Sequence, residues 1–276
     1  MRKEEGAIVL FDIRDEDRAV YTLEELTGVG AEYWFHERIK NASRYDFTDA
    51  DQDVERALRC YNGSMPSLDE IELIITHLTS NSNACKSIRK NGLIDLKKAY
   101  SHRDSELRAF LDAQGVEILI DSCCLKYRGR YFDISYEDCP VDHETEEYAA
   151  WSIGRKLYYD FTVCGFLSLN ERQVYAGNVH RRPEILWDLD NLLHTNFQEL
   201  WQRNHKPYEI IFTIPVRDTI YNGWDSDSEE EMVMNYLTEA YMCALIGPDT
   251  REILCCNNVE VFPNQIKSCR RFHLWN

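Results

Sequence analysis

One window of the chain combines the patterns of a strand, a polar site and a helix: Ile74-Ile75-Thr76-His77-Leu78-Thr79-Ser80, followed by Asn83-Ala84-Cys85-Lys86-Ser87-Ile88-Arg89-Lys90-Asn91-Gly92-Leu93. The apolar run before His77 predicts a strand, because short apolar runs rich in β-branched residues favour extended structure. The second stretch predicts a short amphipathic helix that ends at Gly92, since glycine is favoured where a helix stops. A histidine and hydroxyl side chains therefore stand between a strand and a helix.

His77 also has a simpler interpretation, in which its side chain is hydrogen-bonded in the protein core. In that case Thr79 and Ser80 cap a helix that begins near Asn81, because serine and threonine accept hydrogen bonds from the first free N–H groups of a helix.

Length and composition indicate a soluble protein with a substantial core, since the chain has 276 residues of which 44% are hydrophobic. No apolar run approaches the roughly 20 residues of a membrane span. No signal-peptide core follows the first residues, so we expect a cytoplasmic protein.

The ten cysteines are scattered and include the adjacent pairs Cys123-Cys124 and Cys255-Cys256. We expect reduced thiols.

The formal net charge of −17 argues against broad attraction to nucleic-acid phosphates. Arg181-Arg182 and Arg270-Arg271 are the visible basic pairs, and we expect each to be a solvated surface pair. The acidic run at residues 225–231 predicts a solvated loop that leads into a helix, because carboxylates are favoured at helix N-termini. An acidic surface that binds a protein partner, or that mimics nucleic acid, is the alternative.

The order of the predicted elements indicates a mixed α+β protein. Turn residues near residue 66 suggest an acidic N-terminal subdomain at 1–66 and a main domain at 67–276. Strands are predicted at 7–13, 116–120, 131–136, 208–216, 240–246 and 259–262. Helical structure is predicted at 22–26, 104–113, 144–159 and from 183 past 201.

Several common catalytic signatures are missing from the sequence. Gly28-Val29-Gly30 lacks the third glycine of a dinucleotide-binding loop, and no phosphate-binding loop of the Gly-x-x-x-x-Gly-Lys type occurs. There is no Gly-x-Ser-x-Gly turn of a serine hydrolase. Cys139 and His143 lie four residues apart, but a zinc site needs further ligands at suitable spacing. We expect no metal.

The window around His77 resembles the entry to the ADP-ribosyltransferase fold of the diphtheria-toxin and poly-ADP-ribose-polymerase type. The resemblance covers roughly residues 70–96 and rests on the apolar strand, His-x-Thr/Ser and the helix that ends in Ile-x-x-x-Gly-Leu. It implies a mixed, mostly antiparallel split sheet with flanking helices. It also implies NAD as substrate, with transfer of ADP-ribose to a protein or nucleic-acid acceptor, or hydrolysis of NAD, and family analogy suggests a toxin or defence role.

The resemblance implies roles for particular residues. His77 and Thr79 would hold the NAD ribose, and Tyr131, in Gly129-Arg130-Tyr131-Phe132, would stack on the nicotinamide, with Tyr175 as the weaker option. An ordinary aromatic residue in a half-buried strand is the other interpretation of Tyr131.

The resemblance further implies a glutamate near a late strand. Breaking the bond between nicotinamide and ribose develops positive charge on the sugar, so a fixed carboxylate stabilises the transition state more than the ground state. Glu239 is the first choice because it precedes the predicted strand at 240–246. Glu252 and Glu260 are the alternatives, and each of the three could also be a surface carboxylate without a catalytic role.

Two other classes of function compete with this interpretation. The chain could be a non-catalytic binding protein, or an acidic inhibitor, on a degenerate version of the same fold. A nuclease built on Asp225 and Asp227 is the least favoured, because no paired metal-binding pattern on a strand supports it.

Overall fold

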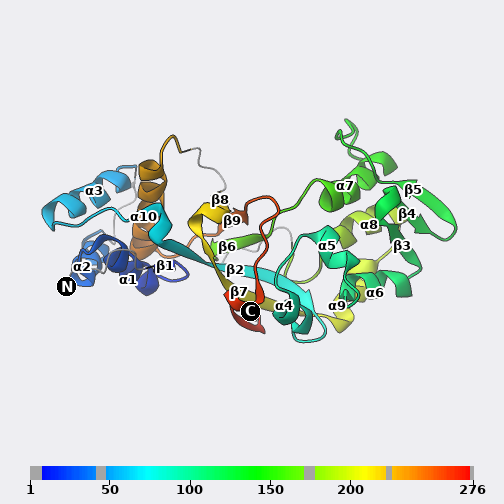
Figure 1. Ribbon diagram of the computed structural model, residues 1–276, viewed down its shortest axis with the longest axis horizontal. Helices are drawn as coiled ribbons and strands as arrows, with labels where there is room; N and C mark the ends of the chain where they lie inside the picture. Colours follow the sequence, from blue (N-terminus) through cyan, green and yellow to red (C-terminus); the bar gives the residue numbers. More distant parts are fainter. Residues whose placement is uncertain (1–7, 42–47, 171–177, 222–225, 274–276) are drawn as a thin grey trace. The chain divides into compact units, whose positions relative to one another are not determined.

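The computed structural model describes residues 8–41, 48–170, 178–221 and 226–273 (Figure 1). The larger sheet has the strand order β10-β7-β2-β6-β9-β8, with β1 paired to β2, and the smaller sheet has the order β3-β4-β5. Strand β6 pairs antiparallel with β2 and β9, and β4 pairs antiparallel with β3 and β5, whereas β1 runs parallel to β2. The predicted α+β class, with antiparallel sheets and flanking helices, is confirmed.

The strands have these bounds: β1 Val9–Phe11, β2 Ile71–Asn81, β3 Val116–Leu119, β4 Cys124–Tyr127, β5 Arg130–Asp133, β6 Cys164–Ser168, β7 Lys206–Pro215, β8 Thr219–Tyr221, β9 Arg251–Cys255 and β10 Ile266–Arg271. The helices are α1 Glu16–Thr27, α2 Ala31–Lys40, α3 Ala50–Cys60, α4 Lys86–Asn91, α5 Leu96–Ser101, α6 Glu106–Ala113, α7 Glu146–Tyr158, α8 Ile185–Leu193, α9 Phe197–Asn204 and α10 Glu229–Ile246. Single 3-10 turns are η1 Leu68–Glu70, η2 Ile120–Ser122, η3 Val216–Asp218 and η4 Pro263–Gln265. In the described part of the chain, no helix combines the length and the apolar character that a membrane span needs.

The chain forms two compact units. The first unit comprises the described parts of Met1–Thr76, Cys164–Gln173 and Phe212–Leu254, and the second comprises those of His77–Val163, Val174–Ile211 and Cys255–Asn276. The described residues of the predicted subdomain at 1–66 all belong to the first unit, together with later segments. A domain boundary at residue 66 stays a prediction.

In the first unit, helices α1, α2 and α3 pack around α10 (Figure 1). Leu23 and Leu26 of α1 and Leu237 of α10 are almost completely buried. Ser228 caps the N-terminus of helix α10, because its side chain accepts a hydrogen bond from the N–H of Glu231, and the first turn of the helix is acidic. The predicted acidic lead into a helix is therefore confirmed for the described residues from 226 onward.

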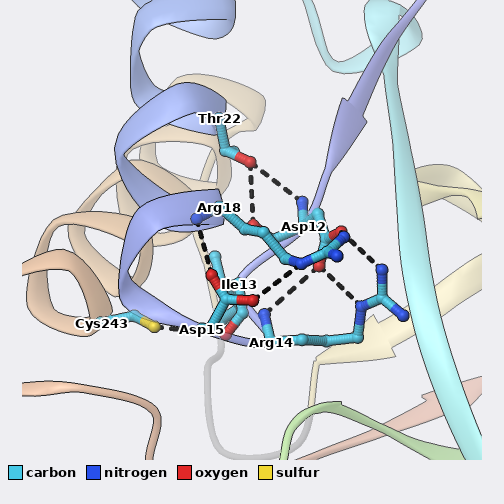
Figure 2. A network of polar contacts seen from close by, with 7 residues as sticks. All are labelled: Asp12, Ile13, Arg14, Asp15, Arg18, Thr22 and Cys243. Atoms are coloured by element: carbon cyan, nitrogen blue, oxygen red, sulfur yellow. Dashed lines mark hydrogen bonds and ion pairs between the residues drawn. The ribbon is translucent and has the colours of Figure 1, made fainter. Parts of the chain in front are cut away.

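Asp12 organises the link between β1 and α1 in this unit (Figure 2). Its carboxylate accepts hydrogen bonds from Nε and Nη2 of Arg14, at 2.8 and 2.7 Å, and from Nη1 of Arg18 at 2.7 Å. The hydroxyl of Thr22 accepts from the N–H of Asp12 and donates to its carbonyl. One buried carboxylate thus fixes the chain direction between a strand and a helix.

In the second unit, helices α7 and α8 pack together and contribute to the core that also covers the β3-β4-β5 sheet. Ile153 and Leu189 are fully buried there. The two helices are also joined by polar contacts, because the Ser152 hydroxyl donates to Asp188 at 2.9 Å and Lys156 lies 3.3 Å from the same carboxylate.

Some predicted elements differ from the structure. Residues 240–246, predicted as a strand, form the end of helix α10, and residues 259–262 contribute only an isolated bridge between Val261 and Leu93. The helix predicted from 183 past 201 is divided into α8 and α9, because His194 adopts a left-handed conformation and the Asp190 carboxylate accepts the N–H groups of the next helix. The predicted turn at 22–26 lies inside α1.

Candidate active site

Strand β2 presents His77 and Thr79 on one face. Successive side chains of a strand point to opposite faces, and burial alternates over residues 77–80 of β2: His77 and Thr79 are half-buried, whereas Leu78 and Ser80 are buried. The hydroxyl of Ser80 accepts a hydrogen bond of 2.8 Å from the indole N–H of Trp201 on α9. In this part of β2 the face of Leu78 and Ser80 is thereby anchored, and the side chains of His77 and Thr79 on the other face remain partly exposed.

Two asparagine side chains hold the turn that leads from β2 into the next helix. Oδ1 of Asn81 accepts from the N–H groups of Asn83 and Cys85, at 2.9 and 2.7 Å, and Oδ1 of Asn83 accepts from Lys86 N–H at 2.8 Å. Helix α4 begins at Lys86, so the interpretation in which Thr79 and Ser80 cap a helix near Asn81 is wrong. Strand β2 runs on to Asn81, which leaves Thr79 within the strand.

The C-terminal end of α4 packs against the chain near residue 261 and is hydrogen-bonded to it. Gly92 ends the helix with a φ of +84°, and a Cβ at this position would lie 2.0 Å from the carbonyl oxygen of Val261. The next residue, Leu93, exchanges two backbone hydrogen bonds of 2.9 Å with Val261. The predicted stop at Gly92 is confirmed, and the close backbone approach explains why a glycine stands there.

Glu260 precedes Val261, the residue hydrogen-bonded to Leu93, and belongs to the same unit as His77. Its Oε1 accepts from Nζ of Lys98 at 2.7 Å, and the same ammonium lies 3.2 Å from Asp95. The Glu260 side chain is about one-third exposed, at 34%. The carboxylate is thus held in position while part of it remains accessible.

Glu239 and Glu252 belong to the other unit. Glu239 is buried on helix α10 and accepts a hydrogen bond of 2.9 Å from Nε of Arg251. The expectation that it precedes a strand is wrong, because residues 240–246 are helical. Glu252 lies on β9, where its Oε1 accepts a hydrogen bond of 3.1 Å from the thiol of Cys164. The catalytic assignment of Glu239 stays a prediction.

Tyr131 lies on β5, an edge strand of the smaller sheet, and is 60% exposed. It pairs with Lys126 of β4, whose ammonium lies 5.8 Å from the centre of the tyrosine ring. Tyr131 shares the second unit with His77 and Thr79. Tyr175, the weaker option for the stacking residue, falls outside the described residues.

An open groove of about 900 Å³ in the second unit was not predicted from the sequence. Its lining includes the side chains of Arg108, Lys126 and Arg128 together with those of Asp112, Glu117 and Asp121. The lining contains both cations and carboxylates, so it has no single sign of charge. The lining residues come from α5, α6, β3, η2, β4 and the β4–β5 turn, and no local pattern in the sequence indicates that these segments meet.

The cysteine within the window is not suited to nucleophilic catalysis. Cys85 is fully buried, and burial together with the nearby Cys269 raises the pKa of its thiol to about 12. A thiol is a nucleophile only as the thiolate, so Cys85 is unreactive at neutral pH. In the described ranges, no three His, Cys, Asp or Glu side chains come together as a metal site would require.

Comparisons with protein-family models, with curated proteins and with solved structures give no match to this chain.

Proposed function

We propose that this protein cleaves NAD at the bond between nicotinamide and ribose and transfers the ADP-ribose to a macromolecular acceptor, or to water. One observation carries the proposal: His77 and Thr79 share the partly open face of strand β2, and the helix that follows ends at Gly92. This is the arrangement of residues on which the resemblance to ADP-ribosyltransferases rests.

In this proposal the chain's own residues act by positioning and by charge. His77 and Thr79 bind the ribose hydroxyls and fix the orientation of the sugar, which lowers the entropy cost of reaching the transition state. Tyr131 supplies an exposed ring for stacking on the nicotinamide. A carboxylate stabilises the positive charge that develops on the ribose as neutral nicotinamide departs.

Glu260 becomes the preferred carboxylate among the three alternatives. It shares a unit with His77, and Val261 beside it is bonded to Leu93 at the end of the window. Glu239 by contrast is buried and belongs to the other unit, where it pairs with Arg251. The ion pair with Lys98 engages Oε1 of Glu260, and the carboxylate remains partly exposed.

A panel of single variants tests these assignments by nicotinamide release from NAD. We expect His77→Ala and Glu260→Gln each to lower kcat by about 100-fold or more, as the loss of one positioning or charge-stabilising group does. His102→Ala, at an exposed histidine of the same unit, is the matched control and should leave the rate unchanged.

The Lys98→Gln variant separates a catalytic from a structural role of Glu260. Glu260→Gln breaks the ion pair with Lys98, whereas Lys98→Gln breaks that pair and the one with Asp95, so Lys98→Gln should lower the melting temperature at least as much as Glu260→Gln. Only Glu260→Gln should abolish turnover. Equal losses of activity in the two variants would contradict a direct role for Glu260. If nicotinamide release is unaffected in all of these variants, the proposed site is wrong and a non-catalytic binding protein is the better explanation.

A further inference from the structure

A basic surface is present on this acidic protein where α4 meets β10. Lys86 and Arg89 of α4 and Lys267 and Arg271 of β10 are all exposed. A guanidinium nitrogen of Arg89 donates to the carbonyl of Cys269 at 2.8 Å, which joins the helix to the strand. We call these four residues, Lys86, Arg89, Lys267 and Arg271, the α4/β10 basic face.

The register of β10 places its two cations on the side that faces α4. Residues 267, 269 and 271 point to one face of the strand, because side chains alternate along it. The thiol of Cys269, between the two cations, interacts with that of Cys85 at the start of α4. Lys267 and Arg271 therefore flank the point where the helix meets the strand.

The four cations have no carboxylate partner among the residues that the structure describes. Nearby carboxylates are engaged elsewhere: Asp104 pairs with Lys90, Glu106 accepts from Ser82, and Glu209 pairs with Arg270 on the other face of β10. Uncompensated cations on a chain of net charge −17 produce a local positive potential that favours an anionic partner.

One exposed and one half-buried aromatic ring border the basic face. Phe262 is 59% exposed and follows Val261, which is hydrogen-bonded to Leu93 just after α4. The guanidinium of Arg271 lies 5.9 Å from the ring centre of Tyr208 on the neighbouring strand β7. Cations that contact a backbone of phosphates, beside rings on which bases stack, are the features of surfaces that bind single-stranded nucleic acid.

We propose that the α4/β10 basic face binds the phosphates of a single-stranded nucleic acid. Strand β10 is the second neighbour of β2 in the sheet order, and the basic face belongs to the same unit as His77. The bound strand is then the acceptor of ADP-ribose, a role that rests on the proposed function, whereas the binding itself does not.

Fluorescence anisotropy with a labelled oligonucleotide, in the absence of NAD, tests the binding. Four phosphate contacts on a single strand predict a slope of log affinity against log salt of about −2.8, so affinity should fall about 50-fold between 50 and 200 mM salt. In the triple variant Lys86→Gln, Lys267→Gln, Arg271→Gln only one contact remains, and the fall should shrink to about threefold.

The matched control is the triple variant Arg59→Gln, Arg155→Gln, Arg203→Gln, which removes three exposed cations elsewhere and gives the same net charge. It should bind as the wild type does. If the first triple variant is unfolded, Lys267→Gln alone should reduce the slope by about 0.7.

Three results would overturn the proposal: no oligonucleotide binding at 50 mM salt, equal loss in both triple variants, or binding to phosphatidylserine vesicles in place of oligonucleotide. Because the assay contains no NAD, its failure would leave nicotinamide release untouched. The failure of the proposed function would likewise leave the anisotropy result intact.

Discussion

At the scale of single residues, Asp12 shows how one carboxylate can fix a connection. Burial raises the pKa of Asp12, but hydrogen bonds and charge from Arg14 and Arg18 (Figure 2) outweigh this effect and hold the pKa below its ordinary value. The ionised form is therefore favoured by folding, and its contribution is present above the pKa of the unfolded chain.

We expect Asp12→Asn to lower the free energy of unfolding by about 2 kcal/mol at pH 7, because two arginines lose their charged acceptor. The difference from the wild type should stay constant above about pH 5 and shrink as the pH falls below about 4, since Asp12 is then protonated in the unfolded chain and progressively in the folded one. Urea unfolding across this pH range measures it. A difference that grows with acidity would contradict the assignment.

A substitution at Gly92 tests the close packing of the end of α4 against Val261. Both Gly92 and Gly115 have a positive φ, but only at Gly92 would an added Cβ meet a backbone atom, the carbonyl oxygen of Val261. Gly115→Ala should cost about 1 kcal/mol for its backbone conformation alone. Gly92→Ala should cost about 2 kcal/mol more than that. Equal costs in chemical denaturation would show that the close approach to Val261 does not matter.

At the scale of elements, Gly154 lets helix α7 approach the chain after β5. A Cβ at this position would lie 1.9 Å from the carbonyl oxygen of the fully buried Ile134. Alanine normally stabilises a helix interior by about 1 kcal/mol relative to glycine.

We expect the opposite at this site: Gly154→Ala should destabilise the protein by about 2 kcal/mol, because the helix must move away from Ile134. Arg155→Ala, at the exposed neighbouring position, should stay within about 0.5 kcal/mol of the wild type. Thermal unfolding of both variants provides the comparison. A stabilised Gly154→Ala protein would mean that α7 does not pack as described.

Periodicity in the sequence was sufficient for some elements and misleading for others. Strands β2 and β7 were predicted because their apolar, β-branched runs are typical of buried strands. The end of α10 was mistaken for a strand, since residues 240–246 are apolar on all sides and a short apolar run does not distinguish a strand from a fully buried helix. The break between α8 and α9 depends on the side chain of Asp190, which periodicity does not reveal.

Only those parts of the candidate site that lie close together in the sequence were predictable. The strand, His77, Thr79 and the stop at Gly92 lie within one short window, so their order in the sequence reproduces their order in the structure. The link between Leu93 and Val261 joins positions far apart in the chain, and no spacing in a single sequence indicates it. The preference for Glu260 over Glu239 follows from that link.

At the scale of the whole molecule, the net charge of −17 has a consequence for stability. Excess charge of one sign destabilises a compact state by self-repulsion, and salt screens it with a Debye length of about 10 Å at 0.1 M. We expect the melting temperature to rise by a few degrees when NaCl increases from about 20 to about 200 mM. A falling melting temperature would instead show that attractive pairs, such as those of Asp12, dominate.

The central claim is that this chain cleaves NAD, and the most direct measurement is nicotinamide release by the purified wild-type protein. Chromatographic quantification of nicotinamide over time, with His77→Ala as the reference, requires no knowledge of the acceptor when water can replace it. We predict release by the wild type that falls about 100-fold in His77→Ala. No release by the wild type, with or without added oligonucleotide or protein acceptors, together with no NAD-dependent change in melting temperature, would contradict the claim.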